Sequence, residues 1–514
     1  MPDWGGGYVT DVEYTEAFYT AQAPQQLALT AIVNGFEPPD VSGGLTYCEL
    51  GCGKGLTSLI LAASNPGATF HAVDFNPAHI AHAQSRAHAA QLSNIFWHEK
   101  SFNELAGKGG DDLPMFDFVT MHGVWSWVAP ELQNAILQFM DRHLKPGGLV
   151  FVSYNGMPAW NFMAPIQRIL RELGGLCAQR SDRSIDGAIA MLARLAEAKI
   201  IPPEFDKALK RLTEGPHRRN LTYLAHEYLN DHWQPAYHAD VARAFSSAKL
   251  AYVGTTDLLR NFTNLTLSDA QRALLDEIAV PELRETLKDF CLDHWFHQDV
   301  YVRGARRTTE ERRDSLLSSV RLALIRPIPS RIEIAGPEET VWQPDAAAYG
   351  PFLEALRSRP HTVSELVSLP GVPASYKRKS VEVVGVLAGT GVTAPYKEPD
   401  AATLASCDRL NRLTEAEGEV ALTQSATIAA ASIGLGMPMP AALFDLYLAL
   451  RRGEKPDAAL FARRFVRRCK DEGGHAIVDG KPYEDEAAAL TPVEQDYRAK
   501  IEHIVPIWRK LGMI

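Results

Sequence analysis

The chain has 514 residues, of which 46% are hydrophobic and 22% are charged; these values are ordinary for a globular protein and allow roughly two to four domains. The formal net charge of -10 argues against a surface that coats nucleic acid, so we expect no nucleic-acid partner. The six cysteines show no C-x-x-C spacing, so we expect reduced, mostly buried thiols and no zinc-ligand pairs.

Residues 1–44 are rich in aromatic side chains but contain no core of their own. The N-terminus, which starts Met1-Pro2-Asp3-Trp4, has no basic segment and no apolar stretch, so we expect no signal peptide and a cytoplasmic protein. Because large aromatic side chains tend to be buried, Tyr8, Tyr14, Phe18 and Tyr19 must pack against another part of the chain.

The segment 47–56 reads as a strand that ends in an acidic residue, Glu49, and runs into the alternating glycines 51, 53 and 55. Glycines let the backbone approach a ligand closely. The third glycine comes one residue earlier than in the G-x-G-x-x-G dinucleotide fingerprint, which favours a nucleotide cofactor without phosphates. Taken alone, the glycines are equally compatible with a plain tight turn.

The residues that follow alternate between short apolar runs and helical stretches. Predicted strands cover 69–74, 94–98, 116–121 and 149–154, and the last follows a Leu-Lys-Pro-Gly-Gly turn at 144–148. Between the first two, Asn76 and Pro77 mark the start of a helix. This alternation is typical of a parallel sheet buried on both faces, so residues 45–160 are predicted to form a nucleotide-binding core.

The glycine loop, with Glu49 before it and Asp74 closing the next strand, resembles the motif pair of class I S-adenosylmethionine-dependent methyltransferases. The resemblance implies a Rossmann-like doubly wound α/β sheet with S-adenosyl-L-methionine as cofactor. By the same resemblance Glu49 reaches the methionine amino group or structures the loop, and Asp74 accepts both ribose hydroxyls. Because the aromatic side chains of residues 1–44 have no core of their own, we expect this segment to cover the cofactor. The residues expected to bind it are Tyr14, Glu49, Gly51, Cys52, Gly53, Gly55, Asp74, Phe75, Ser101, Phe102 and His122.

Residues 161–330 are predicted to be mainly helical, with two strand-like segments at 249–254 and 299–304. A class I methyltransferase sheet has seven strands, the last antiparallel, so these two segments are candidates to complete it. Prolines at 327 and 329 mark the next boundary. In residues 331–514 the pattern predicts a winged helix, and the short basic cluster at 377–379 favours protein contact over DNA binding. The stretch 426–450 contains two prolines and an aspartate, so we expect a buried helix pair and no stable membrane insertion.

Four segments relate the chain to a smaller group of methyltransferases: residues 7–14, 122–128, 153–160 and 224–230. They resemble bacterial methyltransferases that carry a methyltransferase regulatory domain, a family that includes protein lysine methyltransferases acting on outer-membrane proteins. Two motifs differ from the usual family pattern. Residues 158–160 read Pro-Ala-Trp where the family has Pro-Gly-Trp, and residues 296–299 read Phe-His-Gln-Asp where it has Phe-Arg-Arg-Asp. These departures weaken any inference about the substrate but leave the cofactor motifs intact.

The acceptor site is expected at the carboxyl ends of the fourth and fifth strands, beside the cofactor. A lysine acceptor must lose a proton, which a dry aromatic pocket facilitates. We expect Trp125, Trp127 and Trp160 to line that pocket, or else to pack the core. The catalytic candidates are His122, Tyr154 and Asn155. His122 is a base, a positioning group or a structural residue, and Asn155 offers its carbonyl oxygen to the amine.

Three functions remain open from the sequence. Lysine methylation of a protein acceptor is the first, small-molecule methylation the second, and a cofactor-binding regulatory or scaffold protein without turnover the third. The chain lacks the Asn-Pro-Pro-Tyr motif of adenine or glutamine amino-group methylation, and no His/Cys/Asp metal cluster is recognisable, so no metal is expected. The roughly 350 residues beyond a minimal core serve a large acceptor or, alternatively, a homodimer.

Overall fold

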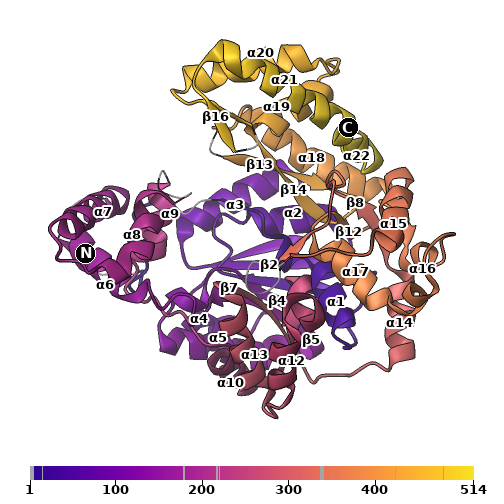
Figure 1. Ribbon diagram of the computed structural model, residues 1–514. Coiled ribbons are helices and arrows are strands. Elements are labelled where there is room, and N and C mark those ends of the chain that lie inside the picture. Colours follow the sequence, from indigo (N-terminus) through magenta and orange to yellow (C-terminus); the bar gives the residue numbers. More distant parts are fainter. Residues whose placement is uncertain are drawn as a thin grey trace.

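A seven-stranded sheet lies at the centre of the molecule, in the order β3-β2-β1-β4-β5-β7-β6 (Figure 1). This computed structural model describes residues 5–13, 16–176, 180–215, 218, 220–335, 341–422, 424–478 and 480–514. The strands β1 to β5 run parallel, and β7 is antiparallel to both β5 and β6. Their bounds are β1 Thr46–Leu50, β2 Thr69–Asp74, β3 Ile95–Glu99, β4 Phe116–Met121, β5 Leu144–Asn155, β6 Leu250–Thr255 and β7 Phe296–Arg303.

The predicted strands are all present, and the two late segments complete the sheet as β6 and β7. The expected turn at 144–148 is corrected, because β5 already begins at Leu144, which pairs with Phe116. The register then shifts before Phe118, and Gly147 takes a φ of 82°. The glycine therefore makes an irregularity inside one long strand and does not precede it.

Helices cover both faces of the sheet (Figure 1). One face carries α1 (Pro24–Val33), α2 (Leu56–Ser64) and α3 (Pro77–Ala89), and the other carries α4 (Phe102–Ala106), α5 (Pro130–His143) and α10 (His238–Ser246). The predicted start of α3 is confirmed, since the Asn76 side chain accepts a hydrogen bond from the Ala78 backbone. Side chains of β5 alternate between the two faces: Phe151 joins the first core, whereas Val152 and Tyr154 join the second.

A separate helical lobe is formed by the middle of the chain (Figure 1). It has its own hydrophobic core, which includes Val12 from the N-terminal segment. The lobe comprises α6 (Ala164–Gly175), α7 (Ser181–Glu197), η4 (Pro203–Phe205), α8 (Asp206–Thr213) and α9 (Leu221–Tyr228). The remaining elements up to residue 320 are η1 (Thr20–Gln22), η2 (Lys108–Gly110), η3 (Trp125–Trp127), η5 (Leu258–Asn261), α11 (Thr263–Thr266), α12 (Asp269–Asp276), α13 (Pro281–Leu292) and α14 (Glu310–Ser319).

The third part of the chain begins with a strand and a short hairpin, and continues with helix, strand, two helices and a strand; its assignment as a winged helix stays a prediction. β8 pairs antiparallel with both β11 and β12, although it lies before the boundary expected near residue 330. The first helix begins after Asp345, which caps it, and runs through Pro351. The elements are β8 (Arg321–Leu324), β9 (Ile334–Ala335), β10 (Val341–Trp342), α15 (Ala346–Ser358), β11 (His361–Thr362), α16 (Val363–Val367), η7 (Ala374–Arg378), α17 (Ser380–Gly389) and β12 (Thr393–Pro395).

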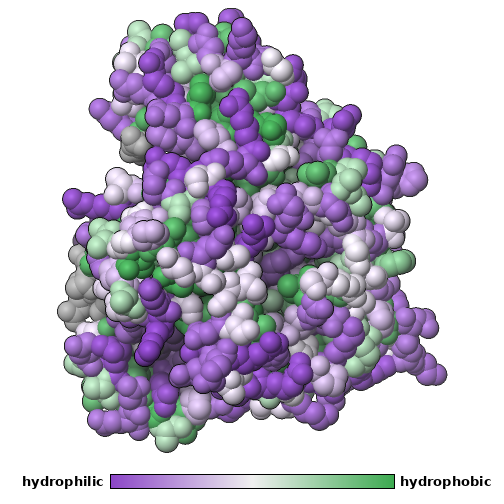
Figure 2. All heavy atoms as spheres, turned by 90° about the vertical axis from the view of Figure 1, so that its right-hand side faces the viewer, coloured by the Kyte–Doolittle hydropathy of each residue, from purple (hydrophilic) through white to green (hydrophobic). Residues whose placement is uncertain are grey.

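The last elements pack outside α2. They are α18 (Ala401–Glu417), β13 (Ser425–Ala430), β14 (Leu435–Pro440), α19 (Ala441–Arg451), α20 (Ala458–Asp471), β15 (Ala476–Val478), β16 (Lys481–Tyr483), α21 (Glu486–His503) and α22 (Val505–Lys510). The helix pair expected within 426–450 is instead a β-hairpin followed by one helix. Among the described residues, none of the helices has the length and apolar character that a membrane span requires. The face shown in Figure 2 is mostly hydrophilic, with hydrophobic residues in several separate patches.

Candidate active site

The glycine loop after β1 is shaped by contacts on one side and open on the other. A Cβ at Gly55 would collide with the ring of Trp97, and Gly55 has a φ of 80°, so only glycine fits there. Among the residues that the structure describes, a Cβ at Gly53 would meet nothing within 4 Å. The backbone amides of Gly51 and Cys52 both donate to the Val73 carbonyl oxygen, which ties the loop to β2. The loop is therefore fixed by β2 and Trp97 on one side, and on the other side Gly53 faces space that a ligand can enter.

Asp74 ends β2 and holds the tip of this loop. Its Oδ2 accepts from the Gly53 backbone at 2.9 Å, and its Oδ1 accepts from the Asn76 backbone at 2.9 Å. Each carboxylate oxygen has two lone pairs, so capacity remains for hydroxyl donors. Phe75, the next residue, lies edge-on to the ring of Tyr8 at 6.2 Å. The expected ribose-binding residue thus occupies the expected place.

Glu49 is buried and faces η1 and α2. Its carboxylate accepts hydrogen bonds from Gln22 Nε2 at 3.0 Å and from the Ser58 hydroxyl, and burial raises its pKa to about 7. This arrangement favours the loop-structuring role over direct contact with a ligand. Gln22 Oε1 is buried and has no hydrogen-bond partner among the described residues. Gln22 was missed from the sequence because it belongs to no motif there.

The N-terminal segment lies between the helical lobe and the glycine loop. The Val9 amide donates to Asn230 Oδ1 at 2.8 Å, and the Val12 carbonyl oxygen bonds His226 Nε2 at 3.0 Å. Glu13 forms an ion pair with Lys54 in the loop. Burial and the nearby Asp74 carboxylate raise the pKa of Tyr8, whose ring therefore stands beside the cofactor residues. Tyr14 lies outside the described residues.

His122 follows β4 and is neutral. The Ser153 hydroxyl accepts from the Gly123 amide at 2.9 Å and lies 3.2 Å from His122 Nδ1; where it donates to Nδ1, the ring proton is on Nε2. Burial lowers the pKa of His122 to about 3, and the ring of Tyr19 stacks on it at 3.6 Å. Such a weakly basic imidazole is suited to donating a hydrogen bond and unsuited to accepting a proton.

Asn155 at the end of β5 meets a carboxylate from α9. Its Nδ2 donates to Glu227 Oε1 at 3.1 Å, and both side chains are buried. Burial raises the pKa of Glu227 to about 7, which the Asn155 amide and the nearby Arg211 only partly offset. Glu227 was missed as a site residue, although it lies in the segment 224–230 that carries the family resemblance. The pair is the strongest candidate for proton transfer at this edge.

Tyr154 does not belong to this site, which corrects its assignment as a catalytic residue. Its hydroxyl donates to Asp299 Oδ2 at 2.7 Å, its ring stacks on His297 at 4.6 Å, and the side chain has no exposed surface. The reason is the alternation of side chains along a strand, which sends neighbouring residues to opposite faces. Tyr154 therefore points toward α10, away from Asn155.

The three tryptophans expected in the acceptor pocket lie in different surroundings. Trp125 packs edge-on against Phe245 at 5.1 Å inside the second core, so its placement in the pocket is corrected. Trp127 is buried, and its Nε1 has no hydrogen-bond partner in the part of the chain that the structure describes. Trp160 donates from Nε1 to the Trp295 carbonyl oxygen at 2.8 Å and belongs to the lobe core. Trp127 therefore keeps a buried N–H without a described partner.

Comparison with known proteins agrees with this geometry. Residues 48–150 match the family described as a methyltransferase domain, and residues 220–303 match a predicted methyltransferase regulatory domain. The uncharacterized protein sll1526 of Synechocystis sp. is 30% identical over 99% of both chains. The chain belongs to the methyltransferases that carry this regulatory domain. Its cofactor is S-adenosylmethionine.

Among solved structures, PKMT2 from Rickettsia typhi in complex with AdoHcy is similar to this methyltransferase, with a TM-score of 0.67 and 18% identity over 96% of this chain and 99% of that one. O-methyltransferase 3 of Dictyostelium discoideum is 28% identical over 23% of this chain and 27% of its own. The similarity to PKMT2 confirms the class I methyltransferase fold. The regulatory-domain match spans α9 to β7, so this domain contributes both Glu227 and two strands of the catalytic sheet.

Ser101 and Phe102 of the methyltransferase lie after β3, where they were expected to border the adenine. The Ser101 hydroxyl caps α4 in a reciprocal pair with Glu104, and Phe102 packs partly buried against the second core. The capping hydrogen bonds explain the position of the Ser101 side chain. Contact with adenine stays a prediction for both residues.

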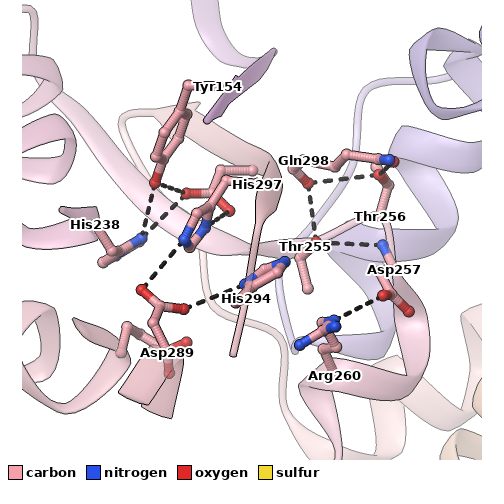
Figure 3. Close-up of polar contacts among 12 residues, drawn as sticks. Tyr154, His238, Thr255, Thr256, Asp257, Arg260, Asp289, His294, His297 and Gln298 are labelled. Atoms are coloured by element: carbon pink, nitrogen blue, oxygen red, sulfur yellow. Dashed lines mark hydrogen bonds and ion pairs between the residues drawn. The ribbon is translucent and has the colours of Figure 1, made fainter. Parts of the chain in front are cut away.

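Five buried residues assemble below the antiparallel edge of the sheet (Figure 3). They come from α10, α13, β7 and the loop before β7, and they are His238, Asp289, His294, His297 and Asp299. No such cluster was recognised in the sequence, yet the structure brings these side chains together, and the expectation that no metal is bound stays a prediction. The spacing D-x4-H-x2-H-x-D at 289–299 is the signal that could have found four of them.

Proposed function

We propose that this methyltransferase transfers methyl groups to lysine side chains of a protein acceptor, and that Glu227 takes up the proton that the lysine must lose. The observation that carries the proposal is the buried Glu227 carboxyl beside Asn155, with a pKa raised to about 7. The fold is similar to that of PKMT2 from Rickettsia typhi, a structure solved in complex with AdoHcy, over 96% of this chain, which supports methyl transfer as the reaction.

The residues around the glycine loop fit the cofactor. When bound, S-adenosylmethionine supplies a methyl group on a sulfonium. Asp74 would hold the ribose hydroxyls, and the free Gln22 Oε1, itself positioned by Glu49, would accept from the methionine ammonium. Gly53 leaves the open side of the loop available, and Tyr8 with Phe75 would flank the nucleoside.

Glu227 would act on the acceptor in two ways. As a carboxylate it attracts the lysine ammonium into a buried setting, where desolvation lowers the pKa of the amine. It then accepts the proton: the Nζ–H bond breaks, and the proton moves to the carboxylate that Asn155 holds through Oε1. With an ordinary amine pKa of about 10.4, transfer to a group of pKa about 7 is uphill by roughly 4 to 5 kcal/mol, which burial of the ammonium reduces.

His122 and Trp127 would position the acceptor. The Nε2–H of His122 is a hydrogen-bond donor fixed by Ser153 and by the stacked ring of Tyr19. The unpaired Nε1–H of Trp127 is a second donor, on an aromatic face that suits a partly methylated cation. Aligning the nucleophile and excluding water are the main requirements of methyl transfer.

The test is to incubate the full chain with S-adenosylmethionine carrying a labelled methyl group and with fractionated bacterial proteins. The label is expected on lysine Nζ in the macromolecular fraction, identified by mass spectrometry of digested protein. Label confined to low-mass products would instead establish a small-molecule methyltransferase. Tight cofactor binding without any labelled product would point to a regulatory or scaffold protein.

The cofactor residues are tested separately by calorimetry. Gly53→Arg fills the open side of the loop, and Asp74→Ala removes the hydroxyl acceptor, so each is expected to weaken cofactor affinity by at least about tenfold. Asp111→Ala, an exposed carboxylate in an ion pair with Arg142, is the matched control and should bind like the parent. Parental affinity in both loop variants, with the fold intact, would refute the cofactor placement.

A further inference from the structure

The cluster below the antiparallel edge joins three histidines and two aspartates in an alternating row, His238, Asp299, His297, Asp289 and His294, of which Figure 3 labels all but Asp299. Asp299 lies between two of the histidines: its Oδ2 is 3.0 Å from His238 Nδ1, and its Oδ1 is 3.3 Å from His297 Nδ1. The potential ligand atoms of His238, His297 and Asp299 all lie within 4.8 Å of one another. These three side chains are at most 3% exposed, so the cluster is closed to solvent.

The distances within the row distinguish two kinds of contact. Charge-assisted hydrogen bonds between imidazolium and carboxylate are usually about 2.7 to 2.9 Å long. The two histidine contacts to Asp299 are longer, whereas the Tyr154 hydroxyl reaches the same carboxylate at an ordinary 2.7 Å. Ligand atoms about 2.0 to 2.1 Å from a tetrahedral zinc ion lie about 3.3 to 3.4 Å apart. The distances between the histidine nitrogens and the Asp299 oxygens therefore approach those between ligand atoms around a zinc ion.

We propose that His238 and His297, each through Nδ1, and Asp299, through a carboxylate oxygen, bind a zinc ion. Two imidazoles and a carboxylate form a donor set that suits zinc. The Tyr154 hydroxyl, which is 3.5 Å from His238 Nδ1, lies beside the fourth position. A site so enclosed is structural, and it would tie α10 of the regulatory domain to β7 and β5.

The second ring nitrogen of His297 also has a partner that suits a metal ligand. Its other ring nitrogen, Nε2, is 3.2 Å from Asp289 Oδ2, and Asp289 Oδ1 is in turn 3.2 Å from His294 Nδ1. A metal-bound histidine almost always gives its second nitrogen to a carboxylate or carbonyl oxygen, which fixes the ring for coordination. Asp289 fills that role for His297, and His294 orients Asp289.

The alternative to a bound zinc ion is a second proton on the His297 ring. Although burial alone lowers it, the flanking Asp299 and Asp289 carboxylates raise the pKa of His297 to about 9 in the chain without an ion. A charged imidazolium would then hold the two aspartates together. His297→Arg separates the two accounts, because arginine keeps the positive charge between the carboxylates but cannot coordinate zinc.

The experiment measures zinc in the purified full chain by mass spectrometry after removal of metal with EDTA, dialysis against micromolar zinc chloride and gel filtration. We expect one zinc per chain, visible bands of tetrahedral cobalt(II) on substitution, and a Tm lower by about 3 to 6 °C when the ion is removed. His238→Ala and His297→Arg should each retain less than about a tenth of the parental zinc.

Two controls locate the ion. His294→Gln, outside the proposed ligand set, should keep one zinc per chain with affinity weakened by about tenfold at most. His71→Gln alters the one other close histidine pair among the described residues, in which His71 Nδ1 lies 3.0 Å from His98 Nε2, and should change nothing. The proposal is overturned if the reconstituted parent holds no zinc, if His297→Arg holds as much as the parent, or if His294→Gln loses the ion while His238→Ala keeps it.

Discussion

Tyr154 and Asn155 are neighbours in β5, yet each hydrogen-bonds a different buried carboxylate. Tyr154 donates to Asp299 on one face of the sheet, and Asn155 donates to Glu227 at the carboxyl edge. Asp299 also contacts two histidines, and although burial raises its pKa, those partners hold it well below the usual range. For Glu227, burial outweighs the partners that lower its pKa, Asn155 and Arg211 among them, and the pKa rises to about 7.

The difference separates a group that holds the fold from a group that is poised to react. A carboxylate whose charge is fully compensated contributes to stability and exchanges no proton near neutral pH. A buried carboxylate with partial compensation destabilises the folded chain when ionised, and such a cost is typical of functional sites. We therefore expect changes at Glu227 to affect turnover, and changes around Asp299 to affect stability.

The largest expected effect is on turnover in Glu227→Gln. Loss of the proton acceptor should lower kcat by at least about 100-fold, while cofactor affinity changes by less than about threefold. The loss should shrink as the pH rises, because free amine then becomes available without a base. Initial rates with labelled cofactor at pH 7 and pH 9 measure both effects.

Glu214→Gln is the matched control, since Glu214 is an exposed glutamate at the end of the neighbouring helix α8. It should retain parental rates. Parental turnover in Glu227→Gln itself would show that Glu227 takes no part in the mechanism. The difference in pKa between Glu227 and Asp299 would then have no bearing on catalysis.

The same substitution should stabilise the folded chain at high pH. The pKa of Glu227 is higher in the folded chain, about 7, than its ordinary 4.5, so the folded chain binds this proton more tightly. The stability that Glu227 contributes is therefore complete below pH 4.5 and is lost as the pH rises to about 7. Glutamine cannot ionise and avoids the loss, which is on the order of 1 to 3 kcal/mol.

The measurement is the difference in Tm between Glu227→Gln and the parent, both without cofactor, at pH 5 and pH 8. The variant should gain on the parent as the pH rises. Because Glu49 also has a pKa raised to about 7 and is present in both chains, its contribution cancels in this difference. An equal difference at both pH values would show that Glu227 is not ionising in this range.

Tyr154→Phe tests the other member of the pair. The variant loses the hydroxyl that donates to Asp299, and a hydrogen bond to a charged group is worth about 1.5 to 3 kcal/mol. We expect a lower free energy of unfolding with kcat within about twofold of the parent. Tyr47→Phe is the control, because its buried hydroxyl bonds the neutral Thr120 at 2.6 Å and should cost only about 1 kcal/mol. A large loss of turnover at parental stability would restore Tyr154 to the active site.

The sequence predicted the parts of this molecule that depend on neighbouring residues. The glycine loop, Asp74, the helix start at Asn76 and all seven strands follow from local patterns, and the structure contains each of them. The partners of Tyr154 and Asn155 lie 145 and 72 residues away along the chain, and no local pattern reports them. The face to which a strand residue points depends on where the strand meets its core, and for this reason Tyr154 was assigned to the wrong side.

The smallest expected effect is at His122, where it decides which group near the acceptor can act as a base. His122→Gln keeps an N–H donor near the place of Nε2 and should lower kcat by no more than about fivefold, and His122→Ala should lower it by about tenfold. Neither change should alter the pH dependence of turnover, because burial lowers the pKa of His122 to about 3 and its ring stays neutral throughout the accessible range. Rates measured from pH 6 to pH 9 test this directly. If the loss in His122→Ala instead exceeds that in Glu227→Gln and disappears as the pH rises, His122 is the base, and the raised pKa of Glu227 reflects burial alone.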